Sequence, residues 1–108
     1  MSFLKNVKTA ADLEQERRDA LLQQLTNAVQ AYLDAGAQER AYDNIFTLCT
    51  YATDPNPRFS AEGKAGVAWR GEVWETCNTI LNDVLAGARP EPTKEEFIAE
   101  LPALGWPV

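Results

Sequence analysis

The sequence predicts an all-α domain, a small bundle of three main helices with a short fourth helix near the C-terminus. Apolar residues recur every three or four positions in each predicted helix, which is the period of an amphipathic helix. Proline and glycine fall between these segments. No segment alternates apolar and polar residues for long enough to indicate a strand. At 108 residues, of which 45% are apolar, the whole chain is expected to form one domain.

The first helix is predicted over residues 10–35, after a leader of residues 1–8 that we expect to fray. Thr9 is a suitable N-cap, and Asp12 three residues later suits the positive end of the helix dipole. Gly36 is expected to end the helix as a left-handed cap. The apolar stripe of this helix is formed by Leu13, Leu21, Leu22, Leu25, Ala28, Val29 and Tyr32.

A second helix is predicted over residues 38–52, and the short connection favours an antiparallel hairpin with the first. Residues 53–59 are expected to form a rigid, extended linker, because Pro55 and Pro57 push the residues before them out of helical geometry. Ser60 then follows as the expected cap of the third helix.

The third helix, predicted over residues 61–87, organises the fold. Its apolar side chains fall in an arc about 160° wide, so more than one other helix should cover it. They are Val67, Trp69, Val73, Trp74, Cys77, Ile80, Leu81, Val84 and Leu85. Gly63 and Gly66 point to the same side, so either the first turns kink or another backbone approaches closely. We favour close approach, because the neighbouring residues are alanines.

A short last helix is predicted over residues 94–101, with Thr93 and Glu96 forming a capping box. Residues 102–108 form an apolar, proline-containing tail. Trp106 in this tail either tucks back onto the bundle, which we favour, or is offered to a partner.

Composition excludes several classes of function. The net charge is −6 with no strongly basic stretch, which disfavours nucleic-acid binding. No apolar run is long enough to span a membrane, and residues 1–8 are too short for a signal core. There is no histidine, so the commonest general base and metal ligand are missing. We therefore expect no catalytic site, no metal, no cofactor and no enzyme, and we expect Cys49 and Cys77 to be buried free thiols.

Three residues are candidates for binding a partner. Trp69 lies at the edge of the apolar arc and Trp106 lies near the chain end, and each is either an exposed contact or part of the core. Arg70 lies near the middle of the same arc. It either forms a structural salt bridge, for instance to Asp43 or Glu39, or snorkels to solvent, or binds an anion or a partner.

Several stretches resemble small proteins encoded beside tail genes in bacteriophages and prophages. The opening VKTAAD is similar to the start of many tail-module polypeptides. About two thirds of the chain resembles the C-terminal part of phage proteins grouped with tail-fibre assembly chaperones, and Trp69-Arg70 with Trp74 is its most distinctive part. The matching stretches are RAYDNIFTLCTYA, RFSAEGKAGVAWRGEVW and RPEPTKEEFIAELPALGWP.

This resemblance implies a non-enzymatic interaction role in tail or tail-fibre assembly, as an assembly chaperone or a minor tail component. The expected partner is a phage tail or tail-fibre protein, and the expected location is the host cytoplasm or the virion. Two alternatives remain: an acidic regulatory protein of prophage origin that binds a basic target, and a small-ligand binder in a cleft near Arg70. We expect a monomer, because residues 12–19 hold too few apolar residues for a strong coiled-coil seam.

Overall fold

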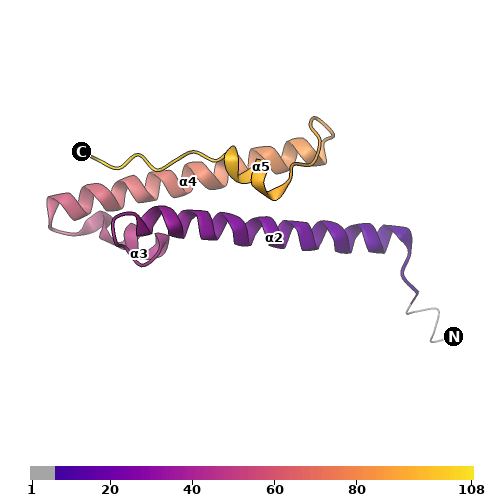
Figure 1. The fold of residues 1–108 in the computed structure, drawn as a ribbon, viewed down its shortest axis with the longest axis horizontal. Coiled ribbons are helices and arrows are strands. Elements are labelled where there is room, and N and C mark those ends of the chain that lie inside the picture. The colour runs from indigo at the N-terminus through magenta and orange to yellow at the C-terminus, as the bar shows by residue number, and fades with distance from the viewer. Residues whose placement is uncertain (1–6) are drawn as a thin grey trace.

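The computed structural model describes residues 7–108 and confirms the all-α class. Two long helices, α2 (Ala10–Gln38) and α4 (Pro57–Leu85), run antiparallel (Figure 1). The short helix α3 (Ile45–Thr50) and a single 3-10 turn, η1 (Tyr51–Thr53), pack against the N-terminal half of α4. Helix α5 (Lys94–Ala99) packs on α2, and the tail then runs along α4. The predicted leader lies mostly outside the described residues.

Helix α2 begins as predicted but ends later. The Thr9 side chain accepts a hydrogen bond from the Asp12 backbone N–H, and the Asp12 carboxylate accepts one from Thr9, which completes a capping box. The prediction that Gly36 ends the helix is wrong, because the helix continues to Gln38. Gly36 instead makes room for Trp69, since a Cβ at Gly36 would lie less than 3.0 Å from the indole. The left-handed turn falls at Ala41, with φ 67°.

The second helix is much shorter than the predicted residues 38–52. Residues 39–44 form a turn, and α3 starts only at Ile45, where the Asn44 side chain accepts from the Thr47 N–H. The carboxylate of Asp34 in α2 accepts from the Ile45 N–H. These two caps hold the start of α3 against α2.

The predicted linker over residues 53–59 is also mostly wrong, because α4 already begins at Pro57. Proline suits the first turn of a helix, where its missing N–H has no intrahelical partner in any case. The Asn56 side chain caps the helix by accepting from the N–H groups of Arg58 and Phe59. Ser60 is therefore not the cap, and its hydroxyl donates to the carbonyl of Ala52.

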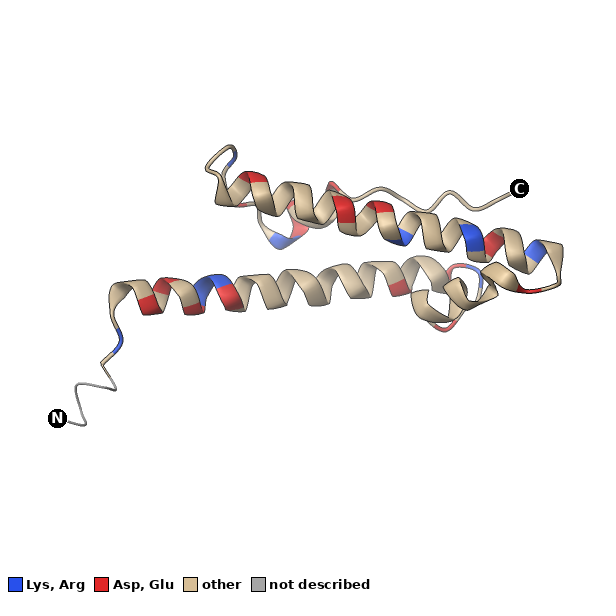
Figure 2. Cartoon of the chain, turned by 180° about the vertical axis from the view of Figure 1, so that it is seen from behind, with Lys and Arg blue, Asp and Glu red and all other residues tan. Residues whose placement is uncertain are grey.

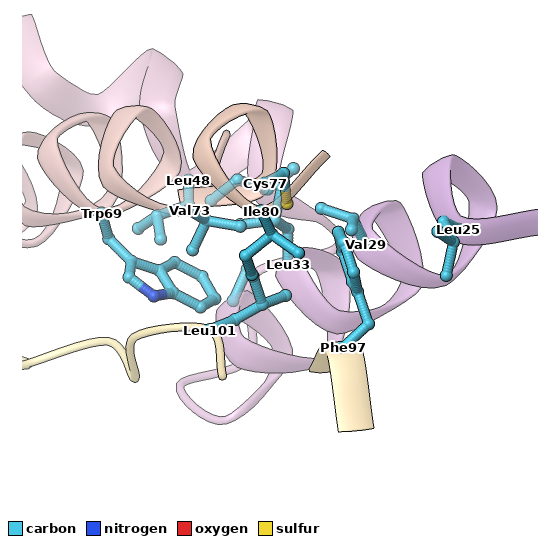
Figure 3. Close-up of a cluster of buried hydrophobic side chains, with 12 residues drawn as sticks. Leu25, Val29, Leu33, Leu48, Trp69, Val73, Cys77, Ile80, Phe97 and Leu101 are labelled. Carbon is cyan, nitrogen blue, oxygen red and sulfur yellow. The ribbon is translucent and has the colours of Figure 1, made fainter. Parts of the chain in front are cut away.

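The core lies along the inner face of α4, as the arc predicted (Figure 3). Buried apolar side chains come from α2, α3, α4, α5 and the second residue after α5. They are Leu25, Val29, Leu33, Ala37, Ile45, Leu48, Trp69, Val73, Cys77, Ile80, Phe97 and Leu101. Two members of the predicted arc, Val67 and Leu85, are exposed. Helix α4 ends at Leu85 rather than 87, and Gly87 follows in the left-handed region at φ 75°.

Close approach at the glycines of α4 is confirmed. A Cβ at Gly63 would lie less than 3.0 Å from the backbone of Tyr51 and Ala52 in η1. A Cβ at Gly66 would meet the side chain of Leu48 at 2.6 Å. The two glycines therefore let α3 and η1 lie directly on α4.

Helix α5 is two residues shorter than predicted. Its capping box is present as expected, since the Thr93 hydroxyl accepts from the Glu96 N–H and the Glu96 carboxylate accepts from Thr93. The buried side chain of Leu101 and the tail of residues 102–108 follow without regular structure.

Candidate interaction surfaces

Trp69, one of the three candidate partner residues, belongs to the core. Its side chain is only 4% exposed, and its indole N–H donates to the carbonyl of Pro102 at 2.7 Å. The hydroxyl of Tyr32 donates to the same carbonyl at 3.0 Å. Of the two interpretations left open by the sequence, the structure supports the core position. Trp69 contributes to a surface only by holding the tail in place.

Arg70 is not buried, although its position near the middle of the apolar arc suggested that it would be. Its side chain is exposed, and within residues 7–108 it forms no ion pair with Asp43, Glu39 or another carboxylate. The buried charge of α4 is Glu62, eight residues earlier. Eight residues at about 100° each amount to two turns and roughly 80° more, so Arg70 shares the broad face that contains Gly63 and Gly66. Its side chain is nevertheless exposed there, whereas that of Glu62 is buried.

Glu62 is 1% exposed and binds two residues of the turn between α2 and α3. Its carboxylate pairs with the guanidinium of Arg40 and accepts from the hydroxyl of Tyr42 at 2.8 Å. Burial raises the pKa of Glu62, but the hydrogen bonds from Arg40 and Tyr42 and the charges of Arg40 and Arg58 outweigh it. The net pKa lies below its ordinary value. Glu62 is therefore a buried carboxylate that stays charged, and it fixes this turn on α4.

The same carboxylate affects the titration of its tyrosine partner. Burial first, and then the hydrogen bond to Glu62, raises the pKa of Tyr42 to about 12. Tyr42 therefore remains a donor throughout the physiological range. This cluster was not predicted from the sequence. Its only signal there is the spacing of Arg40 and Tyr42, two positions apart in a segment that was predicted to be helical.

Trp106 tucks back onto the bundle, as expected. Its ring lies 6.2 Å from that of Tyr42 at an interplanar angle of 14°, and the guanidinium carbon of Arg40 lies 4.9 Å from the ring centroid. Its indole N–H donates to the carboxylate of Glu39 at 3.1 Å. The side chain is half-buried, so one face of the indole is held while part of it reaches solvent.

An open apolar groove of about 510 Å³ lies at the other end of the molecule, between the first half of α2 and the last turns of α4. Its floor is formed by six apolar side chains, namely Leu21, Leu22, Leu25, Leu81, Val84 and Leu85. The rim includes Arg18, Asp19 and Glu91. Leu22 and Leu85 are 48% and 69% exposed. Charged residues gather in the first turns of α2, and none lies between Asp19 and Asp34 (Figure 2).

The groove lies near the C-terminal end of α4, on the same side of the helix that α3 and η1 cover in its N-terminal half. Leu81 and Val84 come 18 residues after Gly63 and Gly66, and 18 residues make about five full turns. These side chains therefore point in the same direction as the two glycines. The short length of α3 leaves this part of the channel between α2 and α4 unfilled.

A second hollow, of about 500 Å³, lies between the tail and the outer side of α4. Three carboxylates line it, Glu72, Glu75 and Glu100. Glu100 is already bound by two hydrogen bonds from Arg89, which with their charge hold its pKa below the ordinary value. Across residues 7–108, no group of three or more His, Cys, Asp or Glu side chains is arranged to hold a metal ion.

The two cysteines are free thiols, as expected. Cys77 is buried and Cys49 is half-buried, and burial raises the pKa of both, to about 11 for Cys77. A raised pKa removes the thiolate that nucleophilic chemistry requires at neutral pH. These two residues are therefore core side chains.

No protein-family model, no curated protein and no solved structure matches this chain. Among the described helices, none is both long enough and apolar enough to cross a membrane.

Proposed function

We propose that the chain is a non-enzymatic interaction protein of phage tail or tail-fibre assembly, acting in the host cytoplasm as a chaperone or minor tail component. The resemblance of residues 40–107 to phage tail-module proteins supports the class. The observation that carries an interaction role is the open groove between α2 and α4, because six apolar side chains line a channel that the fold leaves unfilled.

The groove is suited to an amphipathic helix of the tail protein. Helices commonly bind by placing an apolar face between two helices of the partner. Here α3 already occupies the same channel as a helix and buries Ile45 and Leu48. A bound helix of two or three turns would extend that line and cover Leu22 and Leu85. The rim carries Arg18 as well as Asp19 and Glu91, and Glu91 already pairs with Arg17. The net charge of −6 is therefore what favours lysine or arginine beside the apolar face of the bound helix.

The chemistry of the side chains supports a role without catalysis. The chain has no histidine, its thiols have raised pKa values, and the one fully buried carboxylate within residues 7–108 is bound to Arg40 and Tyr42. A general base or nucleophile needs a group that is both accessible and suitably charged.

Copurification with the tail proteins tests this proposal. We expect the double variant Leu22→Glu/Leu85→Glu to recover a tail or tail-fibre protein about tenfold less efficiently than the wild type, because two charges would enter an apolar contact. The matched control is Val67→Glu/Phe46→Glu, since Val67 is 49% and Phe46 75% exposed outside the groove. Equal recovery by the two double variants would argue against the groove. Binding only to a basic host protein, lost at high salt, would favour the regulatory alternative.

A further inference from the structure

The C-terminal tail is bound to the rest of the molecule as a peptide ligand would be. Residues 102–108 have no regular structure, and no backbone–backbone hydrogen bond ties them to the rest of the described chain. Their backbone is held by side chains at two points. The Pro102 carbonyl accepts from Tyr32 and Trp69, and the Pro107 carbonyl lies 3.5 Å from a guanidinium nitrogen of Arg40. Ala103, Gly105 and Val108 are exposed.

The surface beneath Trp106 provides three kinds of contact to an indole. Tyr42 stacks on the ring, Arg40 places its guanidinium over the ring, and Glu39 accepts from the indole N–H. Guanidinium–aromatic contacts and stacked aromatic pairs each add to the energy of burial. The carboxylate adds a polar contact that phenylalanine would not make, so the surface discriminates in favour of tryptophan.

The walls of this surface do not depend on the tail for their position. Arg40 and Tyr42 are both bound to Glu62, whose side chain is buried. Tyr32 and Trp69 are fixed within the long helices α2 and α4. At these four residues the surface therefore keeps its shape when the tail leaves, and a preformed site binds without the cost of ordering it.

We propose that these five residues, Tyr32, Glu39, Arg40, Tyr42 and Trp69, form a peptide-binding site (the tail site) that the chain's own tail occupies in competition with a partner. The segment it accepts in a partner is extended and apolar, with a tryptophan followed by proline, as in Leu104-Gly105-Trp106-Pro107. The tail site lies at the opposite end of the molecule from the groove, and this proposal does not rest on the proposed function.

A partner segment must displace the chain's own tail to bind the tail site, so the strength of the tail's binding sets the affinity that the partner segment needs. A segment joined by a short flexible connection has an effective concentration of about 1 mM at its own site. A partner segment with the same contacts would bind the intact chain weakly. It would bind well once the tail loses its main anchor, and this difference makes the proposal testable.

The test uses a fluorescently labelled peptide of residues 100–108, ELPALGWPV, added to the whole chain. We expect Trp106→Ala, which empties the part of the tail site formed by Glu39, Arg40 and Tyr42, to bind the peptide at least tenfold more tightly than the wild type does. A peptide with alanine in place of its tryptophan should lose this binding, and adding Tyr42→Ala to the protein variant should weaken it. Equal binding to wild type and Trp106→Ala, or no binding to Trp106→Ala at about 1 mM peptide, would overturn the proposal.

A second measurement avoids any substitution that affects folding. The wild-type chain is labelled with 5-fluorotryptophan, which gives three fluorine resonances, and Trp106→Phe identifies the one from Trp106. Unlabelled peptide at several millimolar should move that resonance toward the position of solvent-exposed tryptophan as the tail is displaced. A Trp106 resonance that stays in place at this peptide concentration would contradict the exchange of tail and partner.

Discussion

Replacing Arg40 with alanine is expected to lower the free energy of unfolding by about 3 kcal/mol at pH 7. Removing one partner of a buried ion pair leaves an uncompensated charge, which typically costs about 3–5 kcal/mol. The lower end applies here because the Arg40 side chain is 42% exposed and its pairing is partly screened by solvent. Tyr42 and the more distant, exposed Arg58 would then be the remaining partners of the Glu62 carboxylate. Urea unfolding followed by circular dichroism measures the difference.

The pH dependence of this loss has a definite sign. In the wild type, the pKa of Glu62 is lower in the folded state, so its contribution to stability is present above the unfolded pKa, near 4.5. That contribution is lost as the pH falls through the folded pKa. Without Arg40, burial dominates and the folded pKa rises above the unfolded value, so protonation then favours folding. The gap between Arg40→Ala and the wild type should therefore narrow as the pH falls from 7 to 4.

Arg58→Ala is the matched control for Arg40→Ala. Arg58 is 78% exposed and lies 3.9 Å from the same carboxylate, and exposed pairs contribute only about 0–1 kcal/mol. Arg58→Ala should therefore lower the free energy of unfolding only slightly, and this difference from the wild type should change little with pH. An Arg40→Ala variant as stable as Arg58→Ala at pH 7 would show that Glu62 does not need its partner.

Replacing Gly63 with alanine is expected to have the second large effect, lowering the free energy of unfolding by about 2–3 kcal/mol. The new methyl group would meet the backbone of Tyr51 and Ala52, which cannot move aside as a side chain can, and overpacking typically costs about 1–3 kcal/mol. The same substitution at Gly71, where a Cβ meets nothing within 4 Å, should raise stability by about 1 kcal/mol through helix propensity.

Thermal unfolding of the two glycine variants gives a direct comparison, because both substitutions lie in α4 and have the same chemistry. We expect the midpoint to fall for Gly63→Ala and to rise for Gly71→Ala. A rise for both variants would mean that η1 does not press on α4 at Gly63.

Local signals in the sequence predicted the features that depend on local chemistry. The helix caps at Thr9 and Thr93 were predicted because N-terminal capping depends on residues only three positions apart in the sequence. The close approach of another backbone at Gly63 was predicted because glycines and alanines on the apolar side of a helix leave room for it. The existence of α2 and α4 followed from their apolar period.

The features that sequence analysis missed depend on contacts between distant segments. Gly36 was expected to end a helix, but a tryptophan 33 residues away fills the space beside it. Arg40 and Tyr42 were placed in a helix, because nothing nearby showed that Ala41 would adopt a positive φ. The groove was also hidden, since its leucines look like core residues until the short length of α3 leaves them uncovered.

The number of assembled tails tests the proposed role most directly. In a phage or prophage that lacks this gene, electron microscopy would count tails after complementation with each variant. We predict that Leu22→Glu/Leu85→Glu restores few tails, whereas Val67→Glu/Phe46→Glu restores the wild-type number, with both proteins folded and equally abundant. Full restoration by the groove variant would contradict the account.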